Sequence, residues 1–214
     1  MIKRTQLALN DAAEWLGDWH PLAEQLGSTD GLLTLASVSS ELRLPPVHDS
    51  ISLERALRQY RDQILVPFEL PAIQAAHGHT SRNELRELIA LDQELQHQPI
   101  LQKFATASRR VGQGQLQKLR PLHDQRFVRR YLHAVEIGLA HGWHTLVYGL
   151  TLEIYSLALR QGLLGYAHQT TRGFIYSAAR MLQLSERQCR DLFERLCVGL
   201  PEAVDELVRQ KAAA

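Results

Sequence analysis

The sequence predicts an all-α fold, a single domain of eight to ten helices over residues 1–214. Apolar residues recur at three- and four-residue spacing through most of the chain, as on the face Leu53, Leu57 and Tyr60. Capping residues and prolines separate these segments from one another. Alternating apolar runs joined by a hairpin dipeptide are missing, because Asp30-Gly31 lacks the flanking pattern.

Residues 1–50 are the least regular part of this domain. Residues 10–28 predict one or two short helices broken at Pro21, and residues 31–37 a short apolar helix or strand. A diproline within 40–50 indicates a loop, since it cannot continue a helix.

The next helix is predicted over residues 50–65. Pro67 and Pro71 are expected to kink or restart it, and its continuation is expected to stop at Gly78.

Ser81 and Glu84 have the spacing of a capping box, which predicts a helix over 82–96. Pro99 suits the first turn of a further helix that runs to about Leu119. The remaining predicted helices are 125–142 with Asp124 as its cap and Gly142 at its end, 144–161, 168–184, 186–197 behind a Ser185–Gln188 capping box, and a short helix through about Gln210.

Two glycines in the stretch RQGLLG predict a break between apolar helices. Gly162 and Gly165 are expected to lie outside the helices, next to Arg160. Two roles for this arginine remain open. Its guanidinium either ties the turn to carbonyls at the end of the preceding helix or faces the carboxylates of a partner.

Gly112 and Gly114 lie inside a predicted helix, where each costs about 1 kcal/mol relative to alanine. A helix that carries this cost is expected to be approached closely by another part of the chain, such as a neighbouring helix.

Composition excludes several classes of protein. The formal net charge of +1 argues against a nucleic-acid binder that depends on bulk positive charge. Cys189 and Cys197 lie about 12 Å apart on one predicted helix, too far for a disulfide, and two isolated thiols suit the reducing cytoplasm. Signal peptides and membrane spans need longer apolar runs than the sequence contains.

The sequence offers little catalytic chemistry. Its ten histidines include the close pairs 77/79 and 141/144, but neither pair has the spacing of a helical metal site, and both are expected at helix ends. Nucleophile and phosphate-loop motifs are missing. The carboxylates of Glu84, Glu87, Asp92 and Glu94 are expected on a solvated helix face. We therefore expect no catalytic residue, metal or cofactor.

Four segments in order resemble the urease accessory protein UreF family. They are LPAIQAAH (70–77), ELIALDQELQHQPILQKFATASRRVGQGQLQKL (87–119), YLHAVEIGLAHG (131–142) and LTLEIYSLALRQGLLGYAHQ (150–169). Arg160, Leu164 and Gly165 match a late signature of the family, in which Tyr166 stands where glutamine is usual. The candidate partner-binding or structural residues on these segments are Ser108, Gly112, His133, Arg160, Leu164, Gly165 and Tyr166.

The resemblance implies an all-helical, homodimeric, cytoplasmic scaffold. Such proteins bridge a UreD/UreH-type accessory protein to the GTPase UreG during nickel insertion into the urease apoprotein. They bind neither nucleic acid nor membrane.

Two other hypotheses remain. The family's Gly-Gly-Phe-Ser-Tyr-Ser-x-Gly-Leu-Glu-like segment is reduced here to SLE at 52–54, and its basic, aromatic tail is replaced by DELVRQKAAA. These departures suggest a divergent UreF-like interaction module that serves another system. The third hypothesis is a helical metal-dependent enzyme using His77, His133 and His141.

Overall fold

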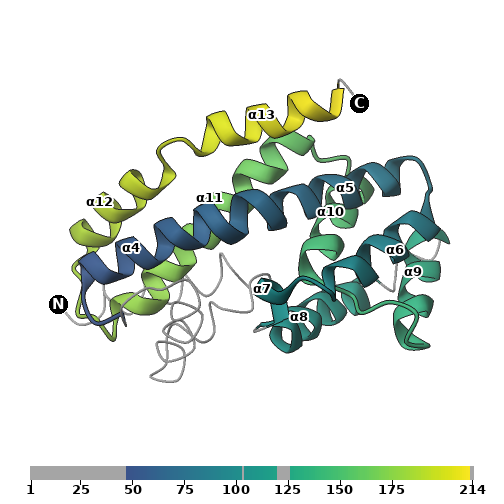
Figure 1. Cartoon of the computed structure of the whole chain (residues 1–214), viewed down its shortest axis with the longest axis horizontal. Coiled ribbons are helices and arrows are strands. Elements are labelled where there is room, and N and C mark those ends of the chain that lie inside the picture. The colour runs from purple at the N-terminus through teal and green to yellow at the C-terminus, as the bar shows by residue number, and fades with distance from the viewer. Residues whose placement is uncertain (1–46, 103, 120–125, 213–214) are drawn as a thin grey trace.

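A continuous helical rod runs along most of the longest axis of the view in Figure 1. It consists of α4 (Ser50–Tyr60), the π-helix η1 (Arg61–Glu69) and α5 (Leu70–Ser81). The computed structural model describes residues 47–102, 104–119 and 126–212. Every regular element within those ranges is a helix, which confirms the all-α class. The irregular region expected over 1–50 lies almost wholly outside them.

The rod begins at a capping box that the sequence analysis did not identify. Asp49 Oδ1 accepts a hydrogen bond from the backbone N–H of Ser52 at 2.7 Å, and Ser52 Oγ accepts one from the N–H of Asp49 at 3.0 Å. The apolar face that follows is buried as expected, with Leu53, Leu57 and Tyr60 each less than 5% exposed. Local side chains thus fix where the rod starts, and burial of one face holds it in place.

Pro67 does not interrupt the rod. It lies inside η1, where the wider π-helical turns accommodate a residue that cannot donate a backbone hydrogen bond. Nine residues of α-helix turn through about 2.5 turns, which would place Tyr60 and Glu69 on opposite faces. The i→i+5 bonding of a π-helix reduces this to about two turns, so both side chains lie on the same, buried face.

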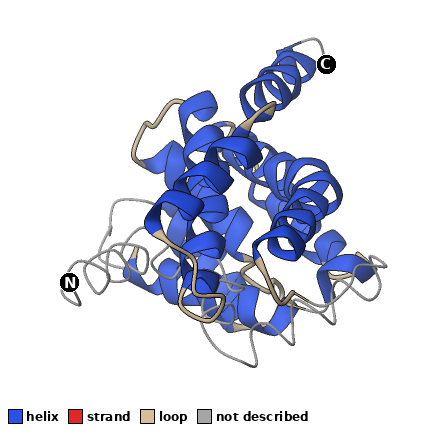
Figure 2. Cartoon of the chain, turned by 90° about the vertical axis from the view of Figure 1, so that its left-hand side faces the viewer, coloured by secondary structure: helices blue, strands red, loops and turns tan. Residues whose placement is uncertain are grey.

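The other helices pack around this rod. They are α6 (Leu85–Leu95), α7 (Pro99–Gln102), α8 (Ala105–Lys118), α9 (Arg126–Glu136), α10 (His144–Ile154), α11 (Leu159–Ala179), α12 (Glu186–Cys197) and α13 (Leu200–Ala212). Helix α10 packs between α5 and α8, and α6 packs against α9. Helix α11 contacts the rod as well as α12 and α13, the yellow helices of Figure 1. Figure 2 shows the described part of the chain as helices and loops, with no strand.

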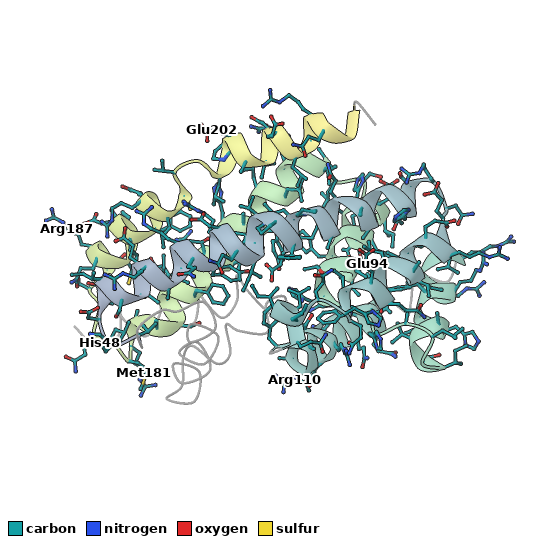
Figure 3. All side chains as sticks on the ribbon, in the orientation of Figure 1. His48, Glu94, Arg110, Met181, Arg187 and Glu202 are labelled. Carbon is teal, nitrogen blue, oxygen red and sulfur yellow. The ribbon has the colours of Figure 1, made fainter. Side chains whose placement is uncertain are left out.

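One hydrophobic cluster joins all of these layers. Its largest fully buried side chains include Tyr131 of α9, Trp143 before α10, and Tyr166 and Phe174 of α11. Tyr60 of the rod meets Phe174 of α11 edge to face, with ring centroids 5.0 Å apart. Charged side chains cover the outside; Figure 3 shows Arg187 projecting away from the bundle.

Four helices end at residues other than those expected. Helix α5 continues past Gly78 to Ser81, α9 stops at Glu136 rather than residue 142, α10 stops at Ile154 rather than residue 161, and α11 stops at Ala179 rather than residue 184. In each case a residue with positive φ follows the helix, namely Asn83, Gly138, Ser156 and Gln183. After α9, Leu139 N–H donates to the carbonyl of Ala134 and Gly138 N–H to that of Val135, which is the Schellman pattern.

The predicted glycine break at 162–165 was wrong. Gly162 and Gly165 lie inside α11, which begins at Leu159, and the break between helices falls at residues 155–158. A Cβ on Gly162 would lie 2.4 Å from a methyl carbon of Leu152 on α10. This glycine therefore lies at a close approach of two helices and not at a turn.

The two capping boxes expected from the sequence differ in outcome. Ser185 and Gln188 form theirs at the start of α12. The other expectation was wrong: Ser81 Oγ donates instead to the carbonyl of Gly78, and Glu84 makes no cap hydrogen bond at the start of α6. Asp124 lies outside the described residues.

The single helix expected over residues 99–119 is two helices. Helix α7 ends at Gln102 and α8 begins at Ala105, after Phe104. Phe104 is buried in the core, with backbone angles outside the helical region. Burial of this aromatic ring accompanies the change in chain direction.

Candidate protein-interaction surfaces

A chain of buried polar side chains crosses the interior. Glu69 Oε2 accepts hydrogen bonds from the hydroxyls of Tyr60 at 2.5 Å and Tyr166 at 3.0 Å. The Tyr166 oxygen lies 2.8 Å from His144 Nε2, and His144 Nδ1 lies 2.6 Å from Ser108 Oγ. Since Tyr166 donates to the carboxylate, it accepts from Nε2–H, and Ser108 donates to Nδ1.

This buried chain connects helices rather than forming a reactive pocket. Burial, together with the charge of Glu69, raises the pKa of Tyr60 and Tyr166 well above the usual value, so both remain neutral donors. The cavity beside Glu69 and His144 measures about 10 Å³, room for a single water at most. Ser108 and Tyr166, two of the predicted site residues, therefore form buried hydrogen bonds that connect α8, α10 and α11.

Asp92 is a second buried carboxylate. Its oxygens accept from the Tyr131 hydroxyl at 2.5 Å and from the backbone N–H groups of His141 at 2.5 Å and Gly142 at 2.9 Å. Trp143 Nε1–H donates to the Asp92 carbonyl at 3.1 Å. The expectation of a solvated carboxylate was wrong here, because Asp92 is fully buried. Its hydrogen bonds hold the segment before α10 against α6.

Gly112 is approached as closely as the sequence suggested. A Cβ at this position would lie 2.1 Å from the carbonyl oxygen of Gly142 and 2.7 Å from the nitrogen of His144. The approaching group is the backbone that leads into α10. Gly112 is thus another internal packing position.

A groove opens on the surface between α6 and α9, with a volume of about 560 Å³. We call it the α6–α9 groove. Its apolar lining is Leu85, Ile89, Ala134, Ile137 and Leu139, and its basic lining is Arg126, Arg129, Arg130 and His133. Ile137 and Leu139 are 55% and 53% exposed. Of the predicted site residues, His133 is the one that lines this groove.

A second exposed apolar surface lies at the turn between α10 and α11. Tyr155 and Leu157 are each more than half exposed there. Arg160 follows in the first turn of α11, where its guanidinium pairs with the carboxylate of Asp205 on α13 at 2.5 Å. Its expected place at the end of the preceding helix was therefore wrong. The exposed ion pair contributes little to stability.

Leu164 and Gly165 lie one turn further along α11. Both are partly buried, and a Cβ on Gly165 would meet only the Tyr148 hydroxyl, at 3.9 Å. The residues of the UreF-like late signature thus lie in different surroundings. Arg160 is exposed, Leu164 and Gly165 lie at the edge of the core, and Tyr166 lies within the core.

The histidines of the metal-enzyme hypothesis belong to different surroundings. His77 pairs with Glu153 of α10 at 3.1 Å, His133 lines the α6–α9 groove, and the backbone of His141 is held by Asp92. Across the described ranges, no three histidine, cysteine, aspartate or glutamate side chains gather where they could hold a metal ion. The described residues thus offer no site for the metal-enzyme hypothesis.

Sequence reasoning missed Glu69, Asp92 and His144, the groups that hold the bundle together. Glu69 lies 97 residues from Tyr166, and Asp92 lies 49 residues from His141. The local signals were the positions of Glu69, a lone acid between apolar residues on the rod, and of Asp92, which shares a helix face with Leu88 and Leu95.

Comparison with known families completes the assignment. Residues 47–197, more than half of the 214-residue chain, match the UreF family. The matched range contains α4 to α12 and leaves out α13. No curated protein matches the sequence. Among the described residues, no helix combines the length and apolar character needed to cross a membrane. The chain belongs to the UreF family, whose members are urease accessory proteins rather than catalysts.

Proposed function

We propose that this protein is a non-catalytic scaffold for urease maturation. It bridges a UreD/UreH-type accessory protein and a UreG-type GTPase while nickel is inserted into the urease apoprotein. The observation that carries this proposal is the family match, which extends over nearly every described helix.

The distribution of polar groups supports a role for the exterior. Glu69 and Asp92, the acids that are buried among the described residues, use their oxygens to bind side chains and backbone of the same chain. Four of the seven large apolar side chains that are exposed among the described residues lie in pairs, Ile137 with Leu139 at the α6–α9 groove and Tyr155 with Leu157 at the α10–α11 turn. Adjacent exposed apolar side chains are typical of surfaces that bind other proteins.

Co-purification tests the bridging role. The tagged full-length chain, expressed with UreD/UreH-type and UreG-type proteins, should retain both, and UreG should be lost when the UreD/UreH-type protein and this chain are not both present. A strain lacking the gene should lose urease activity and regain it on complementation. Absence of binding together with normal urease activity in the deletion strain would refute the proposal.

The proposed scaffold is a cytoplasmic homodimer. Light scattering at micromolar concentration should then give about twice the chain mass of 24.3 kDa. A monomer over the whole concentration range would contradict the dimeric form of the scaffold.

A divergent UreF-fold module that serves another system is the second candidate. It is favoured by one observation: the family match begins at residue 47 and ends at residue 197, so both flanking regions lie outside it. Urease structural genes beside this gene would favour the first candidate, and their absence from the genome the second.

A further inference from the structure

The α6–α9 groove combines an apolar floor with a rim of arginines that pair with no carboxylate of the described residues, and we propose that it binds an acidic amphipathic helix of a partner protein. The inference rests on the proposed scaffold function, because it names one binding surface of that scaffold and the chemistry of its partner.

The floor is an aliphatic strip between two helices. Leu85 and Ile89 lie one turn apart on α6 and are partly buried, whereas Ile137 and Leu139 beyond the end of α9 are more than half exposed. Adjacent aliphatic side chains left in water cost solvation free energy that a covering surface would recover. A strip flanked by two helices has the shape that receives a third helix.

The wall that carries Ile137 and Leu139 is held in a fixed conformation. Gly138 has φ of 78° and closes the Schellman motif at the end of α9. Gln93 Nε2–H of α6 donates to the carbonyl of Leu139 at 3.0 Å, and Asp92 holds the residues that follow. The groove is therefore formed before a partner arrives, which reduces the ordering cost of binding.

The rim carries the charge. Arg126, Arg130 and His133 follow one another at four and three residues along the outer face of α9, with Arg129 beside them. The three arginine side chains make no hydrogen bond or ion pair within the described ranges. Several exposed arginines elsewhere, such as Arg160 with Asp205, are paired with carboxylates of the described residues, although Arg55 and Arg180 are not. In a chain of net charge +1 this is a local excess of positive charge, which favours an acidic partner.

A helix with aliphatic and acidic faces satisfies both parts of the groove at once. Nucleic acid would neutralise the arginines but leave the aliphatic floor exposed to its sugar–phosphate backbone. A membrane requires protruding apolar side chains, and Leu85 and Ile89 lie recessed between helices.

A direct binding assay tests the groove. The probe is a fluorescein-labelled 21-residue helical peptide with leucines at i, i+3, i+4 and i+7 and glutamates on the flanks. Fluorescence anisotropy with the full-length chain should give a micromolar Kd that weakens as salt increases. Arg126→Glu/Arg130→Glu and Ile137→Ser/Leu139→Ser should each weaken binding at least tenfold.

The matched control is Arg55→Glu/Arg180→Glu, which changes two exposed arginines elsewhere by the same total charge. This control variant should bind the peptide as tightly as the unchanged protein. A peptide with lysine in place of glutamate should not bind the unchanged protein. All variants should keep the melting temperature of the parent within about 2 °C, because the altered side chains are exposed.

The outcomes separate this inference from the proposed function. If the parent chain retains the accessory proteins and the groove variants retain them equally, the groove proposal is wrong and the scaffold function stands. If the accessory proteins do not bind but the glutamate peptide binds with the stated variant pattern, the scaffold function fails and the groove proposal stands. Equal binding of both peptides would overturn the groove proposal. So would conversion of a dimer to a monomer by the groove variants, or binding only to RNA or anionic vesicles.

Discussion

Replacing Gly112 by alanine should destabilise the protein although it improves helix propensity. The new Cβ would lie 2.1, 2.7 and 2.8 Å from three backbone atoms of residues 142–144. Backbone atoms cannot rotate away as a side chain end does, so the segment before α10 must shift. That segment also carries the hydrogen bonds to Asp92 and Ser108.

The magnitude follows from two opposing terms. Overpacking in a filled interior costs about 1–3 kcal/mol, and contact with backbone places this site at the upper end or above. Alanine in place of glycine returns about 1 kcal/mol of helix propensity. We expect a net loss of about 2 kcal/mol, which lowers Tm by roughly 4–8 °C in a chain of this size.

Gly114→Ala supplies the matched control on the same helix. Nothing lies within 4 Å of the Cβ it would add, so it should stabilise the protein by about 1 kcal/mol and raise Tm by roughly 2–4 °C. Thermal and urea denaturation of the three proteins, followed by circular dichroism, measures both changes. A Gly112→Ala variant as stable as the parent would refute the packing argument.

Four further predictions concern buried and capping groups. Asp92→Asn places an amide donor among three donors, so the free energy of unfolding in urea should fall by about 1–3 kcal/mol; a change below 0.5 kcal/mol would contradict the buried role. Ser156→Gly relieves a φ of 52° and should raise stability by about 1 kcal/mol, whereas Ser156→Ala should not. Burial lowers the pKa of His168 below 6.5, so its contribution is present above pH 6.5 and is lost as pH falls; the urea midpoint should drop less between pH 7.5 and 5.5 in His168→Gln than in the parent. Burial raises the pKa of Cys189 and Cys197 to about 11, so iodoacetamide at pH 8 should alkylate the folded chain slowly and the urea-unfolded chain fast.

The helical class and most helices could be predicted from the sequence, but several helix ends could not. The spacing of apolar residues indicates which face of a helix is buried, as at Leu53 and Leu57, whichever helices cover that face. Helix ends depend on which residue takes the left-handed conformation. Asn83 and Ser156 do so here, while Gly162 lies inside α11 at a close contact with α10. Glycine has two uses, and local sequence does not distinguish them.

The interior polar groups could not be predicted for a different reason. Asp92 lies on the same helix face as the buried Leu88 and Leu95, but a carboxylate is ordinarily expected in solvent, and its partners come from the distant residues 141–143. Resemblance to a family marked Ser108, Gly112 and Tyr166, but not that they act through His144 and Glu69. His133 was marked in the same way, and its position in a basic groove depends on the packing of α6 against α9.

The π-helical segment of the rod has a consequence for how chain length can vary in this family. Its nine residues complete about two turns, which seven residues of ordinary α-helix would also complete. A relative whose rod is α-helical throughout should therefore be about two residues shorter between its counterparts of Tyr60 and Glu69 if both side chains still meet. Insertions or deletions of one residue at this place would rotate α5 by about a quarter of a turn and separate the pair.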